Sequence, residues 1–352
     1  MRRVHLERAL LPEGIRPMVA LTLDERGTIL ALSEADPALA LPGIALPGLV
    51  NAHTHLDLAG PPQPANGLPD WVRRLPAPSD ARHRIDAMLS TGTAGVVEVS
   101  NTLQALDALA SSPLAFSVHH EVMGIDVHTL PKTIDRRARF SPHAPFSTSP
   151  ELIRAAVASP GPMATIHCDE DPAEREFLAR GNGSWSHFIQ STGRDLSDFV
   201  APGCTPVPYL DRLGVLSPRL ALVHCTLTRG EDLDLIAERG ATVVLCPRSN
   251  LHITDRLPDV PGMIERGIPL ALGTDSLASC PDLDLMKDLA VLQERFPSVD
   301  DEVWLQAATW GGARVLGRED LGRIAPGCRP GIWLKDRWLL PPGNSPAGAT
   351  SC

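Results

Sequence analysis

The stretch from Leu220 to Cys246, LALVHCTLTRGEDLDLIAERGATVVLC, contains the pattern that decides the fold. It opens and closes with short apolar runs, 220–225 and 241–246, of the kind found in buried strands. Between them, residues 230–239 place apolar side chains at helical spacing and end at Gly240, a common helix terminator. A strand, a helix and a second strand in this order predict two parallel strands joined by a helical crossover.

The same alternation extends through most of the chain. Asn101 and Ser149 are suitable N-cap residues for two of the helical segments. The expected strands are 44–52, 95–99, 115–122, 139–144, 162–167, 220–225, 241–246 and 269–273. The expected helices are 101–111, 149–158, 230–239 and 282–295. Eight such strands favour an α/β protein with a (β/α)8 barrel of the TIM type over an open sheet.

The two ends of the chain follow another pattern. Residues 18–33 form two strand-like runs around a polar DERG turn, which predicts a hairpin, and 332–334 is a short apolar run between turn residues. We interpret both ends as one small β-sandwich domain formed by residues 1–47 and 320–352, with the barrel over 48–319. The tail from Pro341 is expected to be loose.

Composition narrows the range of functions. The chain has 352 residues, and its 42 acidic residues outnumber 32 basic ones, for a net charge of −10. This balance argues against a nucleic-acid or membrane partner, so we expect a small-molecule substrate, and a homo-oligomer stays open. The seven cysteines are scattered and form no CxxC pair, which favours a reducing cytoplasm and argues against a cysteine-based zinc site.

Chemistry-bearing side chains gather where four of the expected strands end. The first ends in Asn-Ala-His53-Thr-His55, and later strands end at His167, His224 and Asp275. Side chains two residues apart on a strand point to the same face, so His53 and His55 can bind one ion. An isolated HxH pair could equally be two hydrogen-bonded core histidines. The residues at the other strand ends favour a metal site over two core histidines, because the carboxyl ends of barrel strands share one rim.

Three imidazoles and a carboxylate, from His53, His55, His167 and Asp275, suit one divalent metal, with Zn²⁺ favoured and Fe²⁺ also possible. Such an ion lowers the pKa of a bound water from near 15.7 to about 7, which gives hydroxide at neutral pH. The interval between His167 and His224 is long for a single βα unit. We expect residues 181–208 to form an extended loop over the site.

Three residues are candidates for catalysis. Glu170 follows His167 by three residues, and it could take a proton from the water and pass it to the substrate. His224 could hydrogen-bond the attacking oxygen, and Asp275 could orient the same water while it binds the metal. The plainer alternatives are a solvated loop acid for Glu170 and a helix N-cap for Asp275.

The motifs PGLVNAHTHLD, HCDE, LVHC and LGTDS resemble, in order and spacing, those of the amidohydrolase superfamily. They are most similar to its mononuclear deaminase and chlorohydrolase branch, and ATWGGARVLG at 308–317 extends the likeness towards the C-terminus. The resemblance implies a distorted (β/α)8 barrel with a composite β domain. It also implies the metal ligands and the catalytic residues named above.

The lysine content indicates how many metals to expect. Binuclear members of that superfamily commonly bridge two metals with a carboxylated lysine on the fourth strand. This chain has only Lys132, Lys287 and Lys335, and its expected fourth strand carries Ser141-Pro142-His143 instead. We therefore predict one metal ion.

Substrate-binding residues follow from the resemblance alone. SPHAPFSTS resembles a motif of adenosine-type deaminases, whose histidine, here His143, contacts a purine, and DWVRRL resembles a segment that covers the substrate. CPRSN and Glu121 resemble features of the aminofutalosine deaminase group. The candidate set is Trp71, Glu121, His143, Arg248 and Ser279. Each has an alternative: Trp71 could only pack in a lid, His143 could hold a turn, Glu121 could support a ligand, Arg248 could pair with an acid, and Ser279 could cap a helix.

The expected reaction is hydrolytic deamination of an adenine-like nucleoside, with aminodeoxyfutalosine as the first candidate. Water activated by the metal would attack the amine-bearing ring carbon and ammonia would leave. The alternatives at the same metal are deamination of S-adenosylhomocysteine or methylthioadenosine, a chlorohydrolase, a guanine or cytosine deaminase, and a cyclic amidase. An inactive barrel used as a binding module is a further alternative, but all six metal and catalytic positions are filled.

Overall fold

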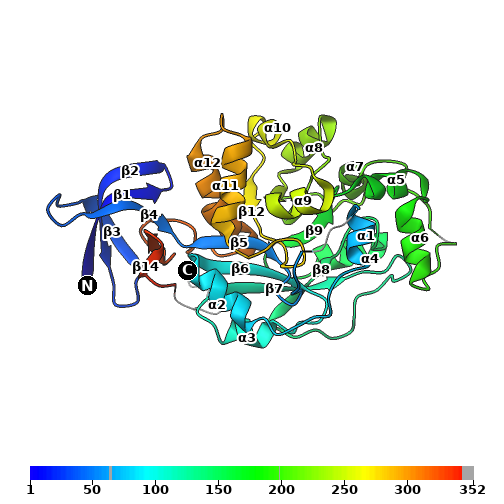
Figure 1. Cartoon of the computed structure of the whole chain (residues 1–352), viewed down its shortest axis with the longest axis horizontal. Coiled ribbons are helices and arrows are strands. Elements are labelled where there is room, and N and C mark those ends of the chain that lie inside the picture. The colour runs from blue at the N-terminus through cyan, green and yellow to red at the C-terminus, as the bar shows by residue number, and fades with distance from the viewer. Residues whose placement is uncertain (63–65, 198, 343–352) are drawn as a thin grey trace.

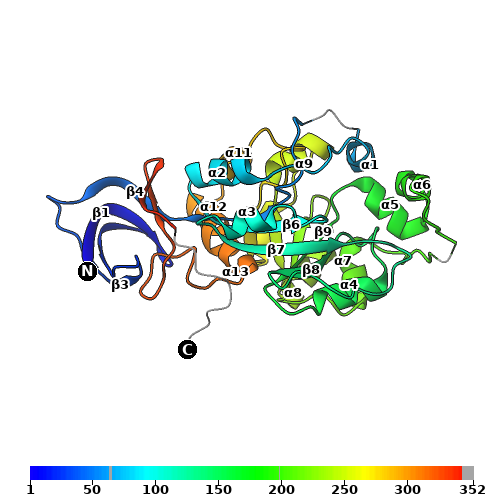
Figure 2. The same ribbon diagram turned by 90° about the horizontal axis from the view of Figure 1, so that it is seen from below.

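Both ends of the chain contribute strands to one sheet. The computed structural model describes residues 1–62, 66–197 and 199–342, so most of the predicted C-terminal tail lies outside the described residues. The strands of this sheet are β1 (Arg2–Leu11), β2 (Gly14–Leu23), β3 (Ile29–Glu34), β4 (Leu41–Pro47), β13 (Ile332–Leu334) and β14 (Arg337–Leu340). They form a single six-stranded sheet in the order β14-β13-β4-β1-β2-β3 at one end of the molecule (Figures 1 and 2).

This pairing agrees with the predicted hairpin, because β2 and β3 are antiparallel across the DERG turn. The C-terminal run joins the sheet through Ile332 and Trp333, which pair with Pro47 and Leu46 of β4. The predicted sandwich of two sheets is not confirmed.

The larger part of the protein contains eight strands in two parallel four-stranded sheets. The first four-stranded sheet contains β5 (Leu49–Thr54), β6 (Thr93–Ser100), β7 (Ala115–Val122) and β8 (Ala138–Pro142). The second contains β9 (Ala164–Cys168), β10 (Leu220–His224), β11 (Thr242–Leu245) and β12 (Leu270–Leu272). Within each sheet the order follows the sequence and each pair is parallel, as the strand–helix–strand pattern predicted.

Hydrogen bonds link the two sheets at the carboxyl ends of their strands. Thr54, at the end of β5, forms a parallel bridge with Asp275, which follows β12. On the other side, the backbone N–H of His167 donates to the carbonyl of His143, just after β8, at 2.9 Å. Segments far apart in sequence therefore meet at one rim.

Helices lie between and around the strands. They are α1 (Leu68–Val72), α2 (Arg82–Ser90), α3 (Leu106–Ala110), α4 (Pro150–Val157), α5 (Pro172–Arg180), α6 (Ser184–Ser191), α7 (Pro206–Arg212), α8 (Glu231–Arg239), α9 (Pro247–Thr254), α10 (Val260–Glu265), α11 (Leu285–Arg295), α12 (Asp301–Gln306), the π-helix η1 (Ala307–Gly311) and α13 (Gly312–Leu316). None of the helices in the described residues is long and apolar enough to cross a membrane.

The predicted helix ends are partly confirmed. The Ser149 hydroxyl accepts the N–H of Leu152 and caps α4, and Gly240 ends α8 with φ 69°. Asn101 is not an N-cap, because β6 runs to Ser100 and α3 begins only at Leu106, after Ala105. The Asn101 side chain instead donates to the Glu121 carboxylate. The segment 181–208 is not only a loop, since it contains all of α6 and the start of α7.

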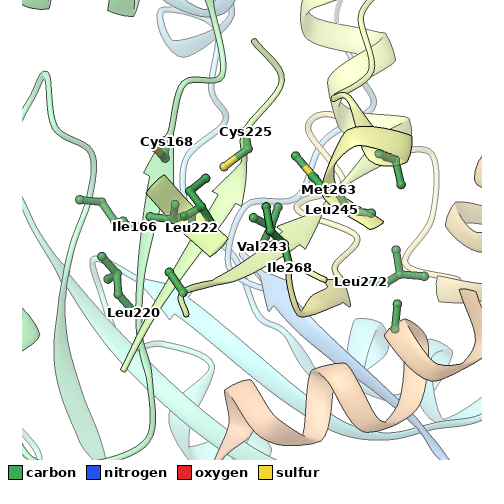
Figure 3. Close-up of a cluster of buried hydrophobic side chains, with 14 of the residues drawn as sticks. Ile166, Cys168, Leu220, Leu222, Cys225, Val243, Leu245, Met263, Ile268 and Leu272 are labelled. Carbon is green, nitrogen blue, oxygen red and sulfur yellow. The ribbon is translucent and has the colours of Figure 1, made fainter. Parts of the chain in front are cut away.

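The core packs tightly on both sides of the strands. Ile166, Leu222 and Val243, from three neighbouring strands, lie in one buried cluster (Figure 3). The chain through η1 and α13 approaches the strands closely, because a Cβ on Gly311 would lie 2.0 Å from the Leu270 carbonyl oxygen. Gly312 faces Val50 in the same way, so only glycine fits at these two positions.

Candidate active site

Two histidines project from the end of β5. His53 is the fifth residue of the strand and His55 follows its last residue, and both side chains are buried. Backbone bonds hold this segment, because the N–H groups of Thr274 and Asp275 donate to the His53 carbonyl at 3.2 and 3.1 Å. The first and last strands of the parallel region therefore fix the HxH pair together.

His167 and Asp275 complete a compact set of donor atoms. The Nε2 atom of His167 lies 3.2 Å from Nε2 of His53 and 3.3 Å from Nε2 of His55. Oδ1 of Asp275 lies 3.9 and 3.8 Å from the same two histidine nitrogens. Four ligands at about 2.0–2.1 Å from a tetrahedral Zn²⁺ would be separated by about 3.3 Å. His53, His55 and Asp275 form one group whose donor atoms all lie within 4.8 Å of one another, and His167 lies within 3.3 Å of both histidines, so these side chains are candidates for holding a single metal ion.

Burial favours the neutral form of two of these histidines, in which a ring nitrogen has a free lone pair. Burial lowers the pKa of His53 well below its ordinary value, and burial lowers the pKa of His167 to about 3. Neutral imidazole is the form that binds a metal. On its other side, His167 directs Nδ1 towards the His143 carbonyl at 3.0 Å and towards Glu121 Oε1 at 3.4 Å. A hydrogen-bond partner on the second ring nitrogen fixes the orientation of an imidazole that binds a metal through the first.

Glu170 and His224 lie beside these donors. Oε2 of Glu170 is 3.6 Å from Nε2 of His224, and both side chains are buried. Burial, with the negative charge of Asp275 next, raises the pKa of Glu170 well above its usual range. The backbone N–H of Glu170 donates to the buried Glu174 carboxylate at 3.0 Å, which holds the residue in place. A raised carboxyl pKa beside a cluster of possible metal ligands suits a proton-transferring group.

The backbone turns sharply where these side chains leave their strands. His224 and Asp275 have φ values of 74° and 60°, and Asp169, between His167 and Glu170, has 55°. Left-handed backbone at non-glycine residues costs free energy and is concentrated at functional sites. Three independent strand ends adopt it here.

A cavity of 520 Å³ opens above this cluster. His55, His167, Glu170, His224 and Asp275 line its polar part. The rest of the wall is largely apolar and comes from α1, from α6 and from the loops after β7 and β8. The apolar lining residues include Leu68, Trp71, Val72, Met123, Ile125, Phe146, Trp185, Phe188 and Ile189. The volume and lining are typical of a small-molecule site.

Three of the predicted substrate-binding residues line this cavity, namely Trp71, Glu121 and His143. The Trp71 indole is anchored, because its N–H donates to the Ala278 carbonyl at 3.1 Å. The ring of His143 lies 5.1 Å from that of His167, and its Nδ1 lies 2.5 Å from the Ser147 hydroxyl. Oε1 of Glu121 has no hydrogen-bond partner among the described residues, although it is buried.

The other two predicted substrate-binding residues, Arg248 and Ser279, are not brought to the cavity wall. The guanidinium of Arg248 pairs with Asp288 and Asp282, both at 2.8 Å. The Ser279 hydroxyl donates to Oδ2 of Asp275 at 3.0 Å. The Arg248 side chain is therefore held by an ion pair and the Ser279 side chain by a hydrogen bond to a candidate metal ligand.

Two residues with clear contacts to the site were missed from the sequence. The Ser249 hydroxyl donates to Oδ2 of Asp275 at 2.5 Å, and Oδ1 of Asn250 lies 3.2 Å from Nδ1 of His224. Both belong to CPRSN, the motif directly after β11 from which the sequence predicts Arg248. The aromatic wall from α6 was missed too, because residues 181–208 were interpreted as a loop.

Parallel strands that bring three histidines and an aspartate close together beneath a cavity define a class, the metal-dependent hydrolases of the α/β type. Residues 44–345 match the amidohydrolase family, and the chain belongs to that family. This confirms the resemblance drawn from the motifs, and with it a hydrolase that acts on C–N bonds.

Named relatives have related activities. The chain is 32% identical over 307 residues to aminodeoxyfutalosine deaminase of Deinococcus radiodurans, over 78% of this chain and 73% of that protein. Helicobacter pylori aminofutalosine deaminase, solved with methylthio-coformycin, superposes with a TM-score of 0.80 at 21% identity, over 94% of this chain and 91% of that one. An adenosine deaminase from Xanthomonas campestris with bound zinc has a TM-score of 0.67 at 23% identity, over 94% and 83%. At these identities the two structures support the fold.

Proposed function

We propose that the protein is a metal-dependent hydrolytic deaminase of an adenine-like nucleoside, and that aminodeoxyfutalosine is its first candidate substrate. One observation carries the proposal: three histidines and an aspartate, with donor atoms 3.2–3.9 Å apart in four of their pairs, lie beside a buried carboxyl group under a largely apolar cavity. The relative from Deinococcus radiodurans, at 32% identity, supports the choice of substrate.

The metal in this proposal is a single Zn²⁺ held by His53, His55, His167 and Asp275. Their nitrogen and carboxylate donors suit zinc, and the zinc-containing relative supports this choice over iron. When bound, the ion would make a water molecule nucleophilic at neutral pH.

Glu170 would manage the protons. Burial raises the pKa of Glu170 and so favours its protonated form, and in this proposal Glu170 begins the reaction with a proton that it gives to the ring nitrogen beside the amine-bearing carbon. As the water oxygen bonds to that carbon, the Glu170 carboxylate takes up a proton from the water. It then passes this proton to the amine, the C–N bond breaks and ammonia leaves. The remaining hydroxyl proton on the attacked carbon returns to the Glu170 carboxylate, which gives the carbonyl product and restores the starting state of the enzyme. One water is consumed and one ammonia is released.

His224 and Asp275 would orient the reacting water. Nε2 of His224 faces Glu170, and Oδ1 of Asp275 faces the histidine cluster. Oδ2 of Asp275 accepts two hydroxyl hydrogen bonds, from Ser249 and Ser279, which keep the carboxylate in one orientation.

The substrate would lie across the cavity with its base over the proposed metal ligands. His143 and Glu121 offer polar contacts and Trp71 an aromatic face. We further propose that the two four-stranded sheets form one distorted (β/α)8 barrel over residues 48–319, with residues 1–47 and 320–352 as the small domain. The expected location of this enzyme is the cytoplasm.

Ammonia release tests the proposal. Zinc-loaded protein should release ammonia from aminodeoxyfutalosine, and adenosine, S-adenosylhomocysteine and methylthioadenosine complete the nucleoside series. Glu170→Gln should keep its zinc and lose nearly all turnover. Glu176→Gln is the matched control, because it makes the same chemical change at an exposed carboxylate of α5 that the cavity lining does not include. Turnover of cytosine, guanine or a chlorotriazine, and of no nucleoside, would contradict the proposed substrate class.

A further inference from the structure

A side chain in the first turn of α9 contacts the active-site residue His224. Asn250 is fully buried there, and Oδ1 of its side chain lies 3.2 Å from Nδ1 of His224. Its amide nitrogen donates to the hydroxyl of Thr226, two residues beyond His224. Both the oxygen and the nitrogen of the Asn250 amide therefore contact the segment that carries His224.

The amide oxygen determines which ring nitrogen of His224 carries hydrogen. A carbonyl oxygen can only accept a hydrogen bond, so the nitrogen that faces it must bear a proton. Nδ1 is therefore protonated whether the ring is neutral or charged. Only Nε2 can gain or lose a proton, and Nε2 is the atom that faces Glu170 at 3.6 Å.

We propose that Asn250 is a positioning residue that keeps a proton on Nδ1 of His224 and so leaves Nε2 as the nitrogen that accepts a hydrogen bond or a proton in the active site. In the opposite tautomer, Nε2 would carry hydrogen and could only donate. Asn250 thus selects between two different roles for the same imidazole.

The position of Asn250 is well anchored. The next residue back, Ser249, donates to Asp275, and Arg248 ties the start of α9 to Asp288 at the N-terminal end of α11. Asn250 also closes the first turn of α9, because its backbone N–H donates to the Cys246 carbonyl at 2.9 Å. A side chain held by its own helix in this way can impose a tautomer on its neighbour.

The consequence for catalysis rests on the proposed function, but the tautomer does not. In neutral His224, the proposal places a lone pair on Nε2, so His224 would accept a hydrogen bond from the reacting water. A variant without the acceptor at position 250 should have a much lower kcat and a nearly unchanged KM, because the pocket that binds the substrate is unchanged.

Nitrogen NMR of the histidine side chains tests the inference directly. The protein is labelled with ¹⁵N at histidine, and the His224 signals are those lost in His224→Gln. In the wild-type protein Nδ1 of His224 should have the shift of a protonated nitrogen and Nε2 that of an unprotonated one. Protonation on Nε2 in the neutral ring overturns the proposal, whatever the enzyme's substrate.

Two variants show whether Asn250 is responsible. Asn250→Leu should shift the proton of His224 towards Nε2, while Asn250→Asp, which keeps an acceptor, should retain it on Nδ1. Ser249→Ala is the matched control, because it removes the adjacent bond to Asp275 and leaves the Asn250–His224 contact. An unchanged His224 spectrum in Asn250→Leu, or the same shift in Ser249→Ala, contradicts the proposal. If Asn250→Leu does not fold, the wild-type spectrum and Asn250→Asp still decide.

Discussion

Arg248 provides a test that separates a structural role from a substrate-binding one. Its side chain is 11% exposed and pairs at 2.8 Å with Asp288, whose side chain is fully buried. It also donates to the backbone carbonyls of Asp282 and Asp284, both at 3.1 Å. Arg248→Met keeps most of the side-chain volume and removes the charge, so Asp288 is left buried without its partner.

The expected loss of stability is about 3–4 kcal/mol. Breaking a buried ion pair by removing one partner costs about 3–5 kcal/mol. Protonation limits the loss, because giving Asp288 a proton at pH 7 costs about 4 kcal/mol from an ordinary pKa near 3.9. For a chain longer than 250 residues, each kcal/mol shifts Tm by about 2 °C, so Tm should fall by about 6–8 °C.

Lower pH should reduce the difference between this variant and the wild type. Burial raises the pKa of Asp288 to about 6 in the wild type, and without Arg248 the pKa should rise further. A raised carboxyl pKa means that the folded state binds more protons than the unfolded chain, so acidification favours the folded variant. Between pH 7 and 5 the gap should shrink by about 1 kcal/mol, because the wild-type Asp288 is also titrated over this range.

Thermal melts of three variants check the reasoning. Asp282→Asn changes the more exposed partner of Arg248 and should cost less than about 1 kcal/mol. The double variant Arg248→Met with Asp288→Leu removes both charges and should recover most of the loss. If Tm of Arg248→Met stays within about 1 °C of the wild type while KM for the substrate rises, the structural role is refuted and the sequence-based hypothesis of substrate binding returns.

Three further perturbations have defined outcomes. Ser149→Ala removes the N-cap of α4 and should lower the free energy of unfolding by about 1 kcal/mol in urea titrations. Gly311→Ala should prevent folding, visible as loss of the cooperative transition in circular dichroism, because the new Cβ would lie 2.0 Å from the Leu270 carbonyl oxygen. Burial lowers the pKa of His143 to about 3, so the unfolded chain binds the extra proton below pH 6.5; in metal-free protein at pH 5.5 this one group should cost about 1.4 kcal/mol, measured as the difference in stability between wild type and His143→Gln at pH 8 and 5.5.

The central fold was predictable because its signals are local. The run AFSVHHEV matches β7 residue for residue, and six other expected strands differ by one or two residues at an end. The expected strand 44–52 is wrong, because it joins the end of β4 to the start of β5, which belong to different sheets. β1 was missed, because Arg2–Leu11 mixes five charged or imidazole side chains with its apolar ones and is a strand only through its pairing with β2 and β4. That pairing is not visible in a short window of sequence.

The site was predictable to the extent that it depends on strand ends. His53, His55, His167 and Asp275 meet because parallel strands share one rim, and their proximity follows from topology. The direction in which a long side chain points does not follow from topology. Arg248 turns towards Asp288, forty residues further along the chain, and no local pattern reveals that α11 places a buried carboxylate there.

The order of the second parallel sheet explains why α9 has so much influence on the site. In the order β12-β11-β10-β9, β11 lies between the strands that lead to Asp275 and His224, yet its own end carries none of the proposed ligands. Instead the chain turns into α9, whose Ser249 reaches Asp275 on one side and whose Asn250 reaches His224 on the other. The helix after a strand that carries no proposed ligand thus contacts Asp275 and His224, the functional residues after the two neighbouring strands. Arg248 holds this helix in place. We therefore expect substitutions at Ser249 and Asn250 to alter turnover while leaving the fold intact, whereas loss of Arg248 should disturb both.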